Sequence, residues 1–344
     1  MGLPENSGLC LHSRYQSGPK NKISDVAGVT AGHCTIKDGN INTGVTAIFP
    51  HQGNIFREKV MAGSAVINGF GKTMGLIQLE ELGTIETPII LTNTLSIGTA
   101  FTALTRYMLE QNPDIGLTTG TVNCMVAECN DGSLNDIRGL HVEESHVLED
   151  LGSACEDFEE GAVGGGTGMC CLGLKGGIGS ASRIITADGR QYTIGALVMS
   201  NFGAAGRLTI GGVHYDTKNK KSAEKPQEKD QGSIIMIIAT DLPLSERQLN
   251  RVSRRTAVSL GRTGSYLGNG SGDIAITFTT ANKVPHYSDQ AILDCRIFHD
   301  DKLDMVFEAA VEAVEEAIIS SLYHSETTTG RDGRTVTGLQ DFLK

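Results

Sequence analysis

The stretch GSIIMIIATD, residues 232–241, decides the fold. Its unbroken apolar run, 234–238, is typical of a strand that is buried on both faces. The residues before it, YDTKNKKSAEKPQEKDQ (215–231), contain no Val, Ile, Leu, Met or Phe. A charged segment of this kind cannot form a core, so we expect a solvated, flexible tail over 215–232.

The junction between Gly232 and Ser233 is therefore an abrupt change from linker to core strand. A chain that cut itself there would leave Ser233 as a new N-terminus. This residue would then carry a hydroxyl nucleophile and a free amine that can act as its base. Glycine before the bond admits backbone conformations that other residues avoid. The junction is thus a candidate site of self-cleavage.

Strands and helices are expected along the whole chain. Apolar or alternating segments predict strands at 26–36, 45–49, 88–91, 122–128, 182–187, 192–200, 233–240 and 273–279. Helical spacing predicts helices at 76–82, 96–111, 246–260 and 303–322. Ser245 and Gln248 form a capping-box pattern at the start of the third helix. This mixture, without internal repeats, predicts one layered α/β or α+β domain over residues 1–344.

The composition excludes several classes of protein. With 344 residues and 39% hydrophobic content, the chain can bury a sizeable core. Its formal net charge of -11 argues against nucleic acid or an anionic membrane as the main partner. No apolar run approaches the ~20 residues of a membrane span, and residues 1–20 lack the apolar core of a secretory signal. The 43 glycines indicate tight turns and close backbone packing.

The cysteines indicate a reducing compartment. There are eight, at positions 10, 34, 124, 129, 155, 170, 171 and 295. They form no CxxC pair and are too sparse for a disulfide scaffold. We therefore expect mostly buried thiols in a cytoplasmic protein.

Several familiar motifs are incomplete. GFGKT (69–73) resembles a phosphate loop, but Val66 occupies the place of its first glycine. GGGTG (164–168) lacks a complete GxGxxG, and no GxSxG segment is present. His141 and His146 are five positions apart and do not share a helical face as zinc-binding HExxH histidines do. We therefore expect no cofactor and no metal.

Three polar features stand at predicted strand ends or glycine turns. Asn201 directly follows the predicted strand 192–200, and Glu128 ends the predicted strand 122–128. Ser271 and Asp273 lie in a glycine-rich segment that leads into a strand. For Asn201 the residues by themselves favour an ordinary turn former; Ser271 and Asp273 could equally belong to a simple glycine loop, and Glu128 could be an exposed carboxylate, so these roles stay open.

Taken in order, these segments resemble the L-aminopeptidase D-Ala-esterase/amidase (DmpA) family, which includes the β-aminopeptidases. The similar segments cover nearly the whole chain and are NKISDVAGV (21–29), GH (32–33), LNDIRG (134–139), GAVG (161–164), GM (168–169), KGGIG (175–179), SNFG (200–203), GS (232–233), TD (240–241) and GRTGS (261–265). The resemblance implies a four-layer αββα sandwich. It also implies a precursor that cleaves itself before a serine and then acts as an N-terminal-nucleophile hydrolase.

Matched by motif, the implied cut lies between Gly232 and Ser233. It would produce an α subunit of residues 1–232 and a β subunit of residues 233–344. Ser233 matches the nucleophile and supplies the α-amine base. Asn201 matches the asparagine whose side chain helps to form the oxyanion hole.

The same resemblance assigns four further residues. Ser271 and Asp273 match the serine and the acidic residue near the nucleophile. Glu128 matches the acid that receives the amino group of the substrate. Asn130 stands in a substrate-binding position where some relatives have tyrosine.

We therefore expect a serine aminopeptidase or amidase that removes an N-terminal residue through an acyl-enzyme on Ser233. Its substrates would be short peptides, amides or esters, with a β- or D-amino acid possible at the N-terminus. Family likeness suggests a homo-oligomer, a tetramer of processed pairs. The alternatives are an acyltransferase of the ornithine-acetyltransferase type or an amide-oligomer hydrolase, which normally use threonine, and an uncleaved, non-enzymatic binding protein.

Overall fold

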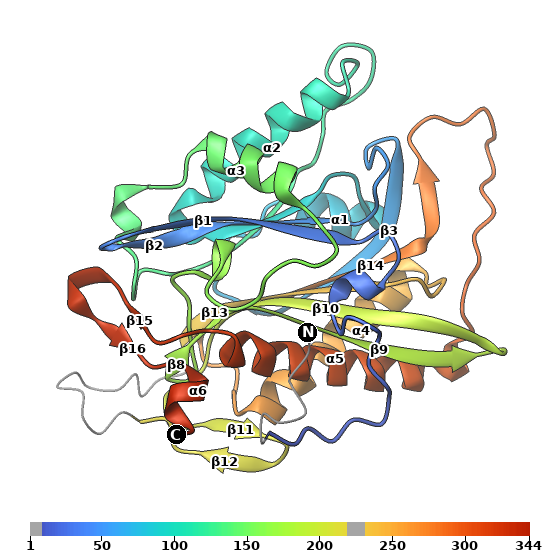
Figure 1. Ribbon diagram of the computed structural model, residues 1–344. Helices are drawn as coiled ribbons and strands as arrows, with labels where there is room; N and C mark the ends of the chain where they lie inside the picture. The colour runs from blue at the N-terminus through green and yellow to red at the C-terminus, as the bar shows by residue number, and fades with distance from the viewer. Residues whose placement is uncertain (1–8, 219–230) are drawn as a thin grey trace.

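Two β-sheets lie face to face, with helices covering both outer sides, in the computed structural model of the chain (Figure 1). The structure describes residues 9–218 and 231–344. Most of the predicted tail 215–232 and the beginning of the N-terminal segment lie outside these described residues. The order of layers is helix, sheet, sheet, helix, so the predicted αββα sandwich is confirmed.

The first sheet has the strand order β1-β2-β5-β6. Its strands are β1 (Thr30–Asp38), β2 (Ile41–Phe49), β5 (Ile89–Asn93) and β6 (Met125–Cys129). The parallel strands β5 and β6 are joined by the helix α2 (Ile97–Gln111), which covers the outer face together with α3 (Glu144–Ser153). The predicted strand 26–36 begins only at Thr30, because Ile23–Asp25 forms a 3-10 turn and Gly28 has a φ of 87°.

The second sheet has the strand order β4-β3-β14-β13-β10-β9. Its strands are β4 (Thr84–Ile85), β3 (Glu58–Gly69), β14 (Gly270–Pro285), β13 (Gln231–Thr240), β10 (Arg190–Asn201) and β9 (Gly177–Ala187). The helix α4 (Glu246–Thr263) connects the parallel strands β13 and β14. It packs on the outer face of this sheet beside α5 (Leu303–Tyr323).

Short elements complete the chain. The small helices are α1 (Leu76–Leu82) and α6 (Leu339–Phe342). The short ladders are β7 (Cys170–Cys171) with β8 (Leu174–Lys175), β11 (Leu208–Ile210) with β12 (Val213–Tyr215), and β15 (Thr328–Thr329) with β16 (Thr335–Val336). The turn Arg331–Gly333 joins the last pair.

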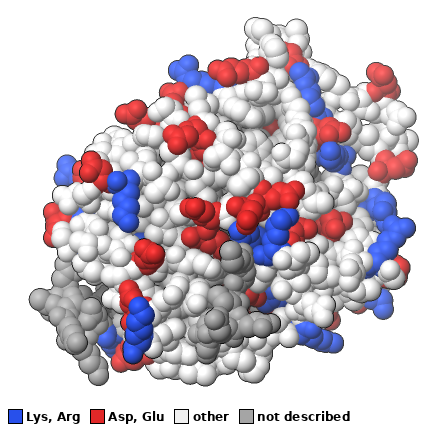
Figure 2. Space-filling model, viewed as in Figure 1, with Lys and Arg blue, Asp and Glu red and all other residues white. Residues whose placement is uncertain are grey.

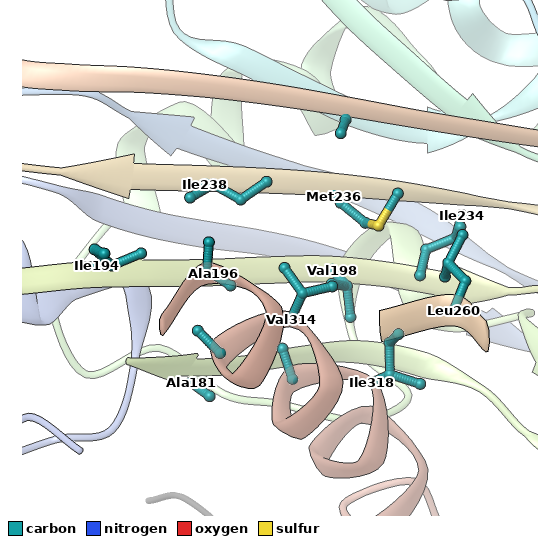
Figure 3. Close-up of a cluster of buried hydrophobic side chains, with 14 of the residues drawn as sticks. Ala181, Ile194, Ala196, Val198, Ile234, Met236, Ile238, Leu260, Val314 and Ile318 are labelled. Carbon is teal, nitrogen blue, oxygen red and sulfur yellow. The ribbon is translucent and has the colours of Figure 1, made fainter. Parts of the chain in front are cut away.

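The strand β13 contributes to both cores. Ile235 and Ile237 are buried between the two sheets. Ile234, Met236 and Ile238 are buried on the opposite face, toward α4 and α5 (Figure 3). The prediction of a strand buried on both faces is therefore confirmed. Each such side chain stabilises the fold by roughly 1.5–3 kcal/mol through its removal from water.

Charged groups are spread over the surface. Figure 2 shows acidic and basic side chains mixed over the visible face. Among the described residues, no helix is long and apolar enough to cross a bilayer.

Glycine allows the helix α5 to approach the sheet closely. A Cβ added at Gly179 in β9 would overlap the carbonyl oxygen of Ala317 in α5. By contrast, a Cβ at Gly261 in α4 would meet no atom within 4 Å. The first glycine is thus required for backbone packing, whereas the second only adds flexibility to a helix.

This contrast predicts opposite effects of the same substitution. Gly179→Ala should lower the free energy of unfolding by about 1–3 kcal/mol, because overpacking forces the helix and strand apart. The matched control Gly261→Ala should raise it by about 0.5–1 kcal/mol, because alanine favours helix. Denaturant unfolding of both variants measures the difference. A neutral effect of Gly179→Ala would contradict the close approach.

Candidate active site

The start of β13 holds Ser233 between two strands. Ser233 is paired with Asn201 of β10 on one side and with Gly272 of β14 on the other. Its side chain is only 5% exposed, and its Oγ donates a hydrogen bond to the Gly232 carbonyl oxygen at 2.7 Å. The hydroxyl therefore lies against the carbonyl group of the residue before it.

Two glycines make room for this arrangement. Gly232 has a φ of 118°, a conformation that L side chains rarely adopt. A Cβ there would also overlap the main-chain oxygen of Asn201. On the other neighbouring strand, a Cβ at Gly272 would lie 3.1 Å from the Oγ of Ser233. Glycine is therefore required at the position before the predicted cut.

Asn201 ends β10 with its side-chain amide held on both sides. Its Oδ1 accepts a hydrogen bond from the Cys170 backbone N–H at 2.9 Å, and its Nδ2 donates to the Asn130 carbonyl at 3.0 Å. These contacts fix the orientation of the amide. Because Nδ2 carries two N–H groups, a second donor is available for a developing oxyanion.

A buried lysine holds the peptide group that binds this amide, and the sequence prediction did not assign the lysine a role. Lys175 is fully buried, and its Nζ donates to the carbonyls of Gly166, Met169 and Gly176 at 3.1, 2.9 and 2.6 Å. The peptide unit between Met169 and Cys170 thus has its carbonyl on the ammonium group and its N–H on Asn201. Burial lowers the pKa of Lys175 to about 8. Because lysine is usually exposed, the sequence does not indicate that this side chain is buried beside the site.

Ser271 and Asp273 form a pair on the strand beside the nucleophile. The Oγ of Ser271 donates to Asp273 at 2.5 Å, and both side chains are buried. In the parallel register of β13 and β14, Ser271 is opposite Gly232 and Asp273 is opposite Ile234. The pair therefore lies one strand away from the predicted cut.

Glu128 is the second-to-last residue of β6, in the other sheet, and is only 3% exposed. Its carboxylate accepts hydrogen bonds from the Lys72 backbone N–H at 2.9 Å and from the Thr94 hydroxyl. The segment 69–73, which fails as a phosphate loop, thus contacts a carboxylate. Asn130 is exposed, and its side chain accepts from the Gly132 N–H at 2.9 Å.

Residues from both sheets line one pocket of about 280 Å³ at this edge. Ser233, Glu128, Asn130 and Gly232 all line it, with Phe70, Lys72, Thr94 and Gly270. A second pocket of about 420 Å³ shares Asn130 and Gly232 with the first and contains Asn201. The predicted nucleophile, carboxylate and amide therefore line two adjoining pockets that share Asn130 and Gly232, and their roles stay predictions.

The histidines that fail the zinc motif make local contacts. His141 lies 3.2 Å from the carboxylate of Asp136, and His146 accepts from the Glu143 N–H at 3.0 Å. Within residues 9–218 and 231–344, no group of three or more His, Cys, Asp or Glu side chains is arranged as metal ligands.

Comparisons with known proteins match nearly the whole chain. The profile of peptidase family S58 matches residues 21–336. A beta-peptidyl aminopeptidase BapA from Sphingosinicella microcystinivorans is 37% identical over 342 residues, which cover 93% of this chain and 85% of that protein. The PH0078 protein from Pyrococcus horikoshii OT3 has 53% identity and a TM-score of 0.94, over 100% of this chain and 97% of that chain.

A third relative has a described activity and fold. The L-aminopeptidase D-Ala-esterase/amidase from Ochrobactrum anthropi has 38% identity and a TM-score of 0.90, over 97% of this chain and 95% of that chain. It is described as a prototype of the serine aminopeptidases and as a variant of the Ntn hydrolase fold. The predicted resemblance is confirmed by these matches.

Lys175 predicts a pH dependence of stability. Burial lowers its pKa from 10.5 to about 8, so between these values the unfolded chain holds the proton that the folded protein has lost. The free energy of unfolding should therefore rise by up to about 3 kcal/mol as the pH increases from about 8 to 10.5. The same stabilisation should be lost when the pH is lowered back to about 8. The length-matched variant Lys175→Met should lack this rise in denaturant unfolding at one protein concentration. An equal rise in both proteins would contradict the assignment.

Proposed function

This chain belongs to peptidase family S58 and is a serine aminopeptidase, and we propose that it creates its nucleophile by cleaving its own chain before Ser233. The observation that carries the proposal is the hydrogen bond of 2.7 Å from the Ser233 Oγ to the carbonyl oxygen of Gly232, which holds the hydroxyl beside that carbonyl group. Cleavage would divide the domain into residues 1–232 and 233–344. The named relatives with described activities are aminopeptidases, so the acyltransferase and binding-protein alternatives are not favoured.

The self-cleavage is an N-to-O acyl shift. The Oγ of Ser233 attacks the carbonyl carbon of Gly232, a C–O bond forms, and the C–N bond breaks. The proton of the hydroxyl passes to the nitrogen, which becomes the α-amine of Ser233. Water then hydrolyses the ester and leaves Gly232 with a free carboxylate. The glycine-only conformation of Gly232 supports this step, because it presents the carbonyl to the hydroxyl without a side chain in the way.

The processed enzyme would repeat this chemistry on a substrate. The free α-amine of Ser233, with a reference pKa of about 7.7–8.0, takes the proton of Oγ as the substrate carbonyl is attacked. The leaving amine receives that proton when the substrate C–N bond breaks, and water releases the acyl group from Oγ. The second N–H of the Asn201 amide is the proposed oxyanion donor. Loss of one such donor typically costs about 10²–10³ in rate.

Glu128 is proposed to restrict the reaction to the first residue of a peptide. Its carboxylate lines the same pocket as Ser233 and is nearly buried. Each of its oxygens already accepts one hydrogen bond and has a further lone pair for an ammonium group. A free amine held there would place the next carbonyl at Ser233. Asn130 lines the same pocket and is proposed to contact the substrate as well.

Ser271 and Asp273 are proposed to support the nucleophile from β14. Their hydrogen bond orients the Ser271 hydroxyl on the strand beside the cut. An ionised carboxylate at Asp273 would favour the protonated α-amine that forms during attack. We also propose that the first residue of the substrate can be a β-amino acid, because relatives of this chain are described as a beta-peptidyl aminopeptidase and a beta-aminopeptidase.

Assembly and location are also part of the proposal. The extended segment 286–299, in orange in Figure 1, exposes the apolar side chains of Tyr287, Ile292 and Ile297. A second copy of the chain would cover them, in a tetramer of processed pairs. All eight cysteines are free thiols, which supports a cytoplasmic location.

Ser233→Ala tests the nucleophile directly. The purified wild-type protein should separate into two fragments on denaturing electrophoresis, and N-terminal sequencing of the smaller one should begin at Ser233. The alanine variant should remain one chain and hydrolyse amino-acid p-nitroanilides at background rate, because it lacks the attacking oxygen. Ser233→Cys is the matched control and should retain cleavage. A cleaved alanine variant would show that the nucleophile lies elsewhere.

Glu128→Gln tests recognition of the amine. This variant keeps the size of the side chain but removes its charge. We expect kcat/KM for a p-nitroanilide with a free amine to fall by about 10²-fold, because a nearly buried ammonium would lose its counter-charge. The exposed control Glu80→Gln should have no effect. An unchanged preference for free over N-acetylated substrates would remove this role from Glu128.

A further inference from the structure

The second pocket, which Asn201 lines, also has a basic side chain in its wall. It adjoins the Glu128 pocket at Asn130 and Gly232. The Gly232 carbonyl marks the position of the carbonyl attacked by Ser233. An attacked carbonyl has two substituents, so a substrate that extends into one pocket on its amine side extends into the other on its leaving-group side. With Ser233 as the nucleophile and the amine at Glu128, the second pocket would receive the leaving group.

Arg331 is the one charged residue among the described residues that line this second pocket. Its Nη1 donates to the Gly132 carbonyl at 3.2 Å, and its Nε lies 3.1 Å from the carboxylate of Asp332. These contacts hold the guanidinium at the pocket wall and use two of its five N–H groups. The side chain is 45% exposed, so a ligand can reach it from solvent.

Other positive charge lies near the same pocket. Burial raises the pKa of the Cys170 thiol in its wall; the charges of Lys175 and Arg334 oppose that rise, and the charge of Asp131 adds to it. In a chain with a net charge of -11, Arg331 is thus the group in the lining of this pocket that can attract a small anion.

We propose that Arg331 binds the free α-carboxylate of the leaving residue, so that dipeptides are the preferred substrate class. This inference rests on the proposed function, because it takes the position of the scissile carbonyl from Ser233. Guanidinium and carboxylate match in geometry and form paired hydrogen bonds. Glu128 would hold the amine and Arg331 the carboxylate of one short substrate, whose two extended residues span about 7 Å across the two adjoining pockets. A third residue would convert that carboxylate to a neutral amide.

The test compares each dipeptide with its C-terminal carboxamide. The substrates are L-Ala-L-Leu and β-Ala-L-Leu, each as the free acid and as the amide. For the first residue that the wild-type enzyme accepts, we expect a kcat/KM about 10- to 100-fold higher for the acid. Arg331→Gln should remove this ratio by lowering turnover of the acid alone, and Arg331→Lys should restore part of it. The exposed control Arg190→Gln should keep the wild-type ratio.

The possible outcomes separate the inference from the proposed function. Equal turnover of acid and amide by the wild-type enzyme would overturn the carboxylate subsite, as would an equal loss of both in Arg331→Gln. Self-cleavage of the variant, seen as two fragments, serves as the check of its folding. If the variant does not fold, the wild-type ratio of acid to amide decides alone. Failure of the proposed function would instead appear as an uncleaved wild-type chain that hydrolyses none of the four compounds.

Discussion

The hydrogen bonds that hold β13 between β10 and β14 determine the geometry of the whole site. They place Ser233 opposite Asn201 on one side and Gly272 on the other. Hydrophobic alternation cannot set this register, because both faces of the strand are apolar and a slip by one residue would exchange one apolar face for the other. Gly232 fixes the register of β13, because only glycine fits against the main chain of Asn201 at that point.

Local pattern predicts the elements with the strongest burial but not all of the second sheet. The apolar run of β13 and the long stripe of α5 are both present as expected. The strand β3 (Glu58–Gly69) is missing from the sequence prediction. Its centre, Ala62 to Ala65, consists of small residues, and its end reads as an incomplete phosphate loop. It is a strand because β14 pairs with it along most of its length, and that contact is remote in the sequence.

The candidate site divides in the same way. Ser233 is noticeable because two compositions meet there, whereas Asn201 and Glu128 acquire a role only through the family resemblance. Lys175 lies in the KGGIG segment of the resemblance, which assigns it no role, and Arg331 has no local signal. The contact of Arg331 with Gly132 spans 199 positions, so only the folded chain brings that cation to the pocket. A buried lysine is also contrary to the usual preference of its residue type, which is why composition points away from it.

The central position of β13 has a consequence for the processed protein. Cleavage before Ser233 removes one covalent bond but leaves the strand hydrogen-bonded on both sides and covered on both faces. The two fragments would therefore stay together as one folded body. Unfolding would become a dissociation, so the midpoint of thermal unfolding would depend on protein concentration, as it does for an obligate heterodimer. The uncleaved chain folds in a unimolecular reaction, whereas refolding of the cleaved protein would require two separate chains to meet.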